Sequence, residues 1–252
     1  MDITKFGANK TGSLIEIIGV DGTTHAFIPN LLPTNWKWPE KLWPVLTKAR
    51  EELGRLDGIG FHLPNPQILL APLQKREAQK SSTLEGTITT PAQLAMFEID
   101  PSDSSLKERD RDAVREVNNY ALATRIQKDF GEKLPLSLRL IKILHNVLLD
   151  GVQRAQTAPG EFRRGPVQIG VTSRFVPPPA NELPRLLDNL EKYLHQEKSL
   201  DALVDAFIVH YQFEAIHPFR DGNGRVGRLL LSITIKEWCN LSEQWLYMSA
   251  FF

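Results

Sequence analysis

The sequence predicts a mainly α-helical protein, a helical bundle that carries two small hairpins. Apolar residues recur at helical spacing in successive segments from residue 40 to the C-terminal region, as they do in helices packed around a core. Strand-like alternation is confined to residues 13–28 and 167–171. In the first of these regions, Ser13 to Ile18 and Thr23 to Ile28 flank Asp21-Gly22, a favoured hairpin turn.

The elements after the first hairpin follow in order. Residues 33–44 are rich in Pro and Trp and should form a connector packed on the body, whereas residues 100–112 are charged and should form a loop before a helix. Pro177-Pro178-Pro179 is a stiff link into the next helix. Helices are expected over residues 40–54, 67–85, 91–98, 108–129, 137–151, 183–197, 200–216 and 225–238, with a further one from residue 243 onward.

Two of these helices frame the segment that carries function. The helix over 200–216 has apolar side chains nearly all round, which predicts a central, buried helix, and Ser199 is its expected N-cap. The helix over 67–85 has Ile68, Leu69 and Leu73 on one side, and Gly86 should end it as a left-handed cap.

Composition limits the class of protein. Of the 252 residues, 42% are apolar and 24% charged, which is ordinary for a soluble globular chain. There is no 18-residue apolar run and no signal peptide, so no membrane partner is expected. Cys239 is the only cysteine, which excludes an internal disulfide and favours the reducing cytoplasm. Because 30 basic residues balance 30 acidic ones, a nucleic-acid partner is not expected.

The most informative segment is residues 217–228, which read His-Pro-Phe-Arg-Asp-Gly-Asn-Gly-Arg-Val-Gly-Arg. Asp221 to Gly224 are strong turn residues, and the sequence becomes helical from Arg225, so a loop should lead into a helix N-terminus. The first amides of a helix lack partners and favour an anion. Arg225 and Arg228 leave the same face of the first turn, and guanidinium groups bind phosphate oxygens in pairs.

The same segment supplies a base and a metal ligand. His217 should stand at the C-terminal end of the preceding helix, since Pro218 stops that helix, and its imidazole could accept a proton from an attacking hydroxyl. Asp221 lies too near a phosphate cradle unless a cation sits between them, so we interpret it as a ligand of Mg²⁺. Phe219 should point into the core and anchor the loop.

These residues match a family motif. His217-x-Phe219-x-Asp221-Gly222-Asn223-Gly224-Arg225-x-x-Arg228 resembles the Fic signature, and the chain is identified as a member of the Fic (Fido) family. The resemblance implies a Fic-type helical bundle and transfer of AMP from Mg-ATP to a Ser, Thr or Tyr hydroxyl of a protein. It implies His217 as the catalytic base and Asp221 as the metal ligand. The implied ATP-binding residues are Gly222, Asn223, Gly224, Arg225, Val226, Gly227, Arg228 and Glu85.

Within that list the resemblance assigns individual roles. Gly222 and Gly224 would shape the anion hole, and Asn223 would donate a hydrogen bond to phosphate. Arg225 would hold the β- and γ-phosphates, and Arg228 the γ-phosphate.

A second segment resembles the inhibitory motif of this family. Ser81, Glu85 and Gly86 fit the pattern [S/T]-x-x-x-E-[G/N] at the end of the helix over 67–85. The resemblance implies that Glu85 pairs with Arg228 and blocks seating of the γ-phosphate. It divides the chain into residues 1–58 with the N-terminal hairpin and a helical extension, residues 59–90 with the inhibitory helix, and residues 91–252 with the Fic core, which could lack a C-terminal part.

A third segment, Val167, Gln168, Ile169 and Gly170, resembles the Fic flap, a hairpin that docks the target polypeptide by strand addition. The expected partners are therefore ATP and a hydroxyl-bearing protein, which could be the chain itself. The terminal Phe251 and Phe252 suggest a homodimer contact as an option. Three alternatives remain open: removal of AMP, transfer from another phosphate-containing donor, and a nucleotide-sensing module without catalysis.

Overall fold

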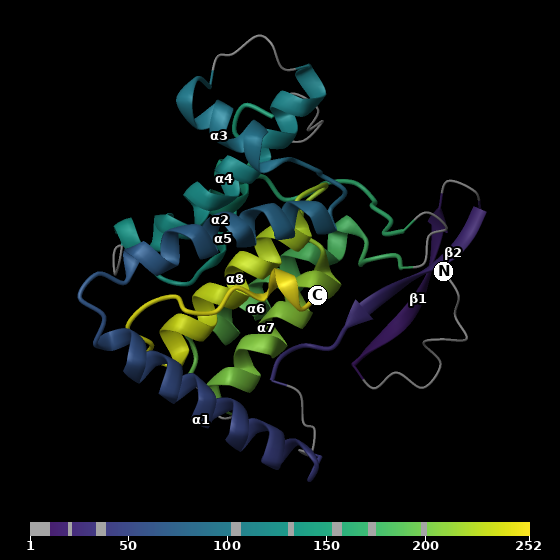
Figure 1. Cartoon of the computed structure of the whole chain (residues 1–252). Helices are drawn as coiled ribbons and strands as arrows, with labels where there is room; N and C mark the ends of the chain where they lie inside the picture. The colour runs from purple at the N-terminus through teal and green to yellow at the C-terminus, as the bar shows by residue number, and fades with distance from the viewer. Residues whose placement is uncertain are drawn as a thin grey trace.

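A computed structural model describes residues 11–19, 22–33, 39–101, 107–130, 134–152, 158–170, 175–197 and 201–252. Eight α-helices among these residues form one body, and a two-stranded antiparallel hairpin projects from its side (Figure 1). The elements are β1 Gly12–Gly19, β2 Gly22–Pro29, α1 Leu42–Phe61, α2 Gln67–Leu84, α3 Pro91–Ile99, α4 Glu108–Phe130, α5 Leu138–Leu148, α6 Leu183–His195, α7 Ala202–Ile216 and α8 Asn223–Trp238, with 3-10 turns at Ala180–Glu182 and Met248–Ala250. The predicted mainly α-helical class with a small hairpin is confirmed.

The N-terminal hairpin has a regular register. Gly12 pairs with Pro29 and Gly19 with Gly22, so β1 and β2 match along their full length. Gly22 adopts a φ of 109°, which a residue with a side chain rarely tolerates, so the turn needs glycine here. Asp21, the other expected turn residue, lies outside the described residues.

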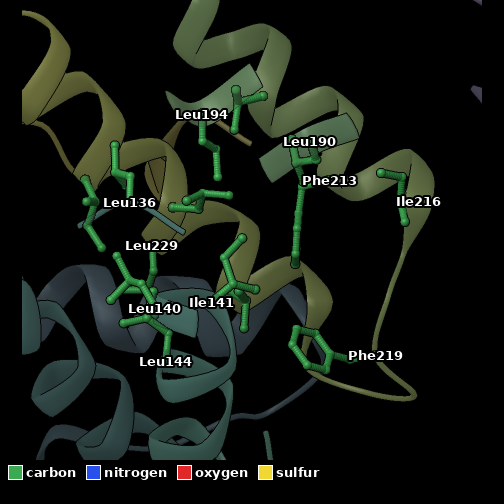
Figure 2. Packing of buried hydrophobic residues seen from close by; sticks show 14 of the residues in the cluster. Leu136, Leu140, Ile141, Leu144, Leu190, Leu194, Phe213, Ile216, Phe219 and Leu229 are labelled. Carbon is green, nitrogen blue, oxygen red and sulfur yellow. The ribbon is translucent and has the colours of Figure 1, made fainter. Parts of the chain in front are cut away.

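The core lies between α5, α6, α7 and α8. Figure 2 shows its large side chains, including Leu140 and Leu144 of α5, Leu190 of α6, Phe213 of α7 and Leu229 of α8, all fully buried. Since every one of these helices contributes to one cluster, the direction of α7 and α8 is set by packing along their whole length. The two ends of the loop between α7 and α8 are therefore fixed by helices that pack in the core.

Two helices are buried differently from what their apolar residues suggest. The side of α2 that carries Ile68, Leu69 and Leu73 faces outward, because Leu70 and Ala78 pack inside. α7 is not buried all round, since Phe207 and Tyr211 are exposed. Local apolar periodicity cannot distinguish an inner from an outer apolar side when both exist.

The helix ends also differ in places. α1 runs to Phe61 instead of ending at residue 54. The predicted boundary between chain segments at residue 58 falls within this helix, and it stays a prediction. α7 begins at Ala202, where the Asp201 carboxylate accepts a hydrogen bond from the Leu203 amide at 2.9 Å. Asp201 thus takes the capping role expected of Ser199, which lies outside the described residues.

The helix expected from residue 243 onward is wrong. Carboxylates of remote helices take the backbone amides of this segment: Ser242 donates to Asp57 of α1 at 2.8 Å, and Ser249 to Glu77 of α2 at 3.0 Å. The Trp245 indole N–H also donates to Asp57, at 2.7 Å. A segment whose amides bind side chains in this way lies as an irregular strap across α1 and α2 and forms no α-helix, apart from the 3-10 turn Met248–Ala250. None of the described helices combines the length and apolarity needed to cross a lipid bilayer.

Candidate active site

His217 terminates α7 in the left-handed conformation. Its φ is 51°, and its amide donates to the Phe213 carbonyl at 2.9 Å as the C-cap of the helix. Residues other than glycine rarely adopt this conformation, and Pro218 then prevents further helix. The chain therefore reverses direction at His217, as predicted.

A buried arginine holds this reversal in place. The Arg163 guanidinium donates to the carbonyls of His217 at 2.8 Å and Ile216 at 3.3 Å, and also reaches the carbonyls of Pro178 and Gly165. Its own amide donates to the Pro218 carbonyl at 2.9 Å. Because the last carbonyls of a helix have no intrahelical donor, Arg163 acts as a side-chain cap for α7. Sequence reasoning assigned Arg163 no role.

The His217 ring is largely enclosed, with 17% of its side chain exposed. Burial lowers the pKa of His217 to about 4, and the neighbouring Arg163 cation acts in the same direction, while the Glu214 backbone carbonyl partly opposes the shift. The ring is therefore neutral at physiological pH. A neutral imidazole has the free lone pair that a general base needs.

The loop after His217 is tied to the core by Phe219 and Asn223. Phe219 is fully buried, as expected, and Figure 2 shows it at the base of the loop below Ile216. The Asn223 amide accepts from the Phe219 N–H at 2.8 Å and donates to the Phe219 carbonyl at 2.9 Å. Both ends of the Asn223 side chain thus close the loop, whereas the sequence-based expectation gave that amide to phosphate.

His145 of α5 supports the loop from below. Its ring stacks on Phe219 with centroids 3.7 Å apart and planes 3° from parallel. Nδ1 accepts from the Gly160 amide at 2.8 Å, so Nε2 carries the proton and donates to the Asp221 carbonyl at 3.1 Å. Burial lowers the pKa of His145 to about 4, which keeps this tautomer neutral. The sequence alone assigned His145 no role, because its partners lie in other elements.

The helix α8 begins at Asn223, two residues earlier than expected. Gly222 is its N-cap with a φ of 77°, and the first hydrogen bond of the helix runs from Val226 to the Gly222 carbonyl at 3.0 Å. The amides of Asn223, Gly224 and Arg225 precede that bond and have no intrahelical acceptor. They form the positive end of a buried helix, which suits an anion.

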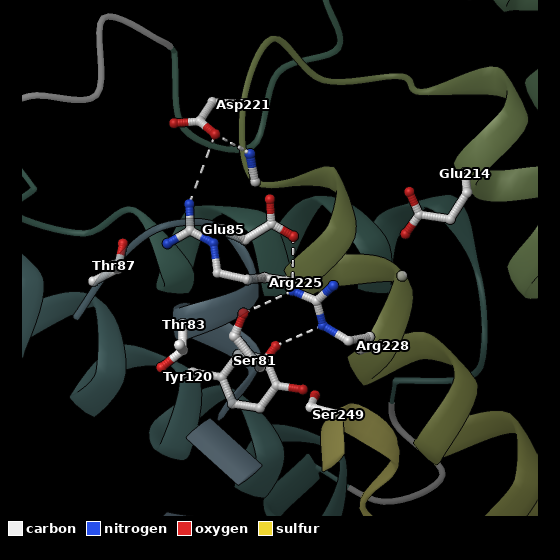
Figure 3. A network of polar contacts seen from close by, with 12 residues as sticks. Ser81, Thr83, Glu85, Thr87, Tyr120, Glu214, Asp221, Arg225, Arg228 and Ser249 are labelled. Carbon is white, nitrogen blue, oxygen red and sulfur yellow. Dashed lines mark hydrogen bonds and ion pairs between the residues drawn. The ribbon is translucent and has the colours of Figure 1, made fainter. Parts of the chain in front are cut away.

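The two arginines of the first turn meet carboxylates from two other helices. Arg225 pairs with Glu116 of α4 at 2.7 Å, with both side chains buried, and its guanidinium also lies 3.8 Å from Asp221 (Figure 3). Arg228 pairs with Glu85 at the end of α2 at 2.8 Å. Between these residues, Val226 is buried in the core and Gly227 faces Glu214 of α7.

Ser81, Glu85 and Gly86 assemble around Arg228. Ser81 is fully buried and accepts from Arg228 through its hydroxyl at 2.8 Å and its carbonyl at 2.9 Å (Figure 3). Gly86 has the expected left-handed conformation, with a φ of 81°. The Glu85 carboxylate lies over Gly224, where an added Cβ would be 2.1 Å from Oε1. A negative charge therefore occupies the space directly above the helix N-terminus.

Asp221 points away from the core with 58% of its side chain exposed, and its carboxylate accepts from the Gly222 amide at 2.6 Å. Among the described residues there is no group of three or more His, Cys, Asp or Glu side chains suited to hold a metal. One carboxylate fits a Mg²⁺ ion that takes its remaining oxygens from phosphate and water.

The described residues of the predicted flap form a single β-bridge. Ile169 and Phe175 pair as an antiparallel bridge with hydrogen bonds of 2.9 and 3.3 Å, Val167 and Ile169 are half-buried, and Gln168 and Gly170 are exposed. Its tip, residues 171–174, lies outside the described residues. The base joins the N-terminal hairpin, because the Phe27 amide of β2 donates to the Val176 carbonyl at 2.9 Å.

The fold and the site together define a helical bundle in which a helix N-terminus, whose first amides have no intrahelical acceptor, lies beside a histidine. The sequence matches two family profiles, "Fic/DOC family N-terminal" over residues 43–126 and "Fic/DOC family" over residues 135–235. The chain belongs to the Fic/DOC family, as predicted.

Named relatives agree over part of the chain. A probable protein adenylyltransferase of Aquifex aeolicus is 36% identical over 90 residues, which are 36% of this chain and 28% of that protein. The protein adenylyltransferase Fic of Drosophila grimshawi is 38% identical over 109 residues, 42% of this chain and 22% of that protein. The match thus spans less than a third of each of these two relatives.

Solved structures share the fold. A Fic family protein from Desulfovibrio desulfuricans superposes with a TM-score of 0.58 at 27% identity, covering 81% of this chain and 59% of that one. Fic-1 from C. elegans superposes with a TM-score of 0.61 at 21% identity, over 77% of this chain and 57% of that one.

Proposed function

We propose that this protein is a protein adenylyltransferase that transfers AMP from Mg-ATP to a Ser, Thr or Tyr hydroxyl of a protein. The observation that carries the proposal is the neutral His217 ring beside a helix N-terminus that two arginines flank. Similarity to named protein adenylyltransferases supports the same reaction class.

The reaction divides the work among residues of this chain. His217 takes the proton of the target hydroxyl while the hydroxyl oxygen bonds to the α-phosphorus, and the bond from that phosphorus to the bridging oxygen breaks to release pyrophosphate. The amides at the start of α8, with Arg225 and Arg228, bind phosphate oxygens and stabilise the developing charge. Asp221 would hold the Mg²⁺ ion, which neutralises phosphate charge when bound.

The target polypeptide would dock along the flap. Residues 167–170 form an edge whose backbone can pair with an extended segment, and such pairing is nearly blind to the target sequence. Self-modification is one outcome of this docking mode.

Glu85 would repress the reaction. Its carboxylate holds Arg228 and occupies the space above Gly224, where the triphosphate would need a positive site. A charge-assisted pair of this kind is worth about 1.5–3 kcal/mol, which corresponds to roughly tenfold to hundredfold repression.

The test uses ATP labelled at the α-phosphate, Mg²⁺ and a lysate, with wild type and Glu85→Gly side by side. We expect Glu85→Gly to label itself or other proteins roughly tenfold to hundredfold faster than wild type. The double variant Glu85→Gly, His217→Ala serves as the background. The proposal would be contradicted if the double variant labelled proteins as fast as Glu85→Gly does, or if none of the three proteins gave any labelling.

A further inference from the structure

Glu214 of α7 lies one helical turn before His217, on the side of the ring that carries Nδ1. Its Oε2 is 4.0 Å from Nδ1 of His217. Residues three apart at a helix end share a face, so this proximity follows from the position of both residues on α7. None of the roles proposed above uses Glu214.

The orientation of the His217 ring separates its two nitrogens. Nδ1 is buried, whereas the side chain as a whole keeps 17% of its surface exposed. The exposed part therefore lies toward Nε2. A target hydroxyl can reach only Nε2, and Nδ1 is left facing the Glu214 side of the ring.

The carboxylate of Glu214 lies against a glycine of α8. A Cβ at position 227 would stand 2.1 Å from Oε1 of Glu214 and 3.3 Å from the His210 ring. Only glycine leaves room for this carboxylate between α7 and α8. Figure 3 shows the Glu214 carboxylate directed toward the part of the site that holds Arg228 and Glu85.

We propose that Glu214 is the positioning residue of the base: its carboxylate, 4.0 Å from Nδ1, stabilises the imidazolium that forms when Nε2 accepts the hydroxyl proton. The inference rests on the proposed adenylyl transfer. A carboxylate behind a catalytic imidazole favours its protonated form, so its effect falls on the chemical step and leaves ATP binding unchanged.

Glu214 also links the base to the inhibitory glutamate. Burial raises the pKa of Glu214 to about 7; Arg228 opposes the shift, and Glu85 adds to it. The charged groups around Glu214 are thus Arg228, Glu85 and the His217 ring, with His210 beyond Gly227. When Glu85 withdraws, the ionised form of Glu214 becomes more favourable.

The kinetic test compares Glu85→Gly with Glu85→Gly, Glu214→Gln at pH 8, where the carboxylate is ionised. Gln keeps the size of Glu and removes its charge. We expect kcat to fall roughly tenfold, with KM for ATP within about twofold, because Glu214 acts through His217. Glu214→Asp should recover part of kcat. The matched control is Glu237→Gln. Glu237 lies on α8, burial raises the pKa of its carboxyl group as well, and its substitution should leave kcat unchanged.

A second measurement does not depend on catalysis. Nitrogen-15 NMR of the His217 ring in the same two proteins should show that Glu214→Gln lowers the pKa of the ring. An unchanged pKa of the His217 ring, or an unchanged kcat, would overturn the role of Glu214. If the parent transfers no AMP while the ring responds to Glu214→Gln, the proposed reaction fails and the Glu214–His217 pair stands.

Discussion

The loop at residues 217–223 and the flap at residues 167–175 are positioned in opposite ways. The loop is tied at each step by a buried side chain: Arg163 at its start, Asn223 at its end and His145 beneath it. In the flap, among the residues that the structure describes, Ile169 and Phe175 pair through two backbone hydrogen bonds, and Gln168 and Gly170 are exposed. Groups that perform chemistry need sub-ångström placement, whereas an edge that receives a polypeptide needs open backbone.

The largest expected effect removes the base from the rigid loop. In the Glu85→Gly background, His217→Ala should lower AMP transfer by about 100-fold to 10,000-fold, while the dissociation constant for ATP changes little, because a base acts in the transition state. Transfer is measured with labelled ATP and binding by calorimetry. Loss of ATP binding in a folded variant would show that His217 serves binding instead.

The next variant weakens the attachment of the loop itself. Arg163→Met should lower the free energy of unfolding by about 3 kcal/mol, since it leaves several buried carbonyls without a donor. Urea unfolding measures this change. Its neighbour Arg164, whose side chain is 91% exposed, is the control, and Arg164→Met should cost less than about 0.5 kcal/mol. Equal losses would mean that Arg163 does not hold the loop.

Acid should weaken the loop region through His145. Its folded pKa of about 4 lies below the ordinary value of 6.5, so the unfolded chain binds more protons between these values. The free energy of unfolding should fall as pH drops from about 6.5 to 4 and level off below, by at most about 1.4 kcal/mol per pH unit for this residue. His217 contributes in the same direction.

His145→Gln should therefore flatten the pH dependence of unfolding, measured by urea titration at several pH values. The control is His195→Gln, which alters an exposed histidine. An unchanged slope for His145→Gln, or an equal change for both variants, would contradict the assignment.

The smallest effect is expected at the flap. Ile169→Pro removes the amide that donates to Phe175, so transfer to a protein target should fall roughly tenfold while the free energy of unfolding changes by less than about 1 kcal/mol. Ile169→Val keeps the amide and is the control. Target labelling and urea unfolding are measured on both. A loss of stability comparable to that of Arg163→Met would remove the contrast between the two regions.

Several features of the site were predictable because they depend on neighbours in the chain. The end of α7 at His217 follows from Pro218, the burial of Phe219 from its place between two helices, and the left-handed Gly86 from the end of α2. The order of His217, Asp221, Arg225 and Arg228 sets their spacing on a loop and one helical turn.

Other features could not be found this way. The outward side of α2 looks like a core side in the sequence, and the strap after residue 241 reads as a helix until Asp57 and Glu77 take its amides. Arg163 and Glu116 are ordinary charged residues until folding buries them.

The helical class, the family motif and the residue types at the site can be read from the amino-acid sequence alone, since short-range spacing and turn chemistry are local properties. The groups that surround His217 come together through folding: Arg163 lies 54 positions earlier in the chain, and Glu214 shares a face of α7 with His217. Burial and desolvation arise from segments remote in the chain, and these set the protonation state of the imidazole and the order of the loop.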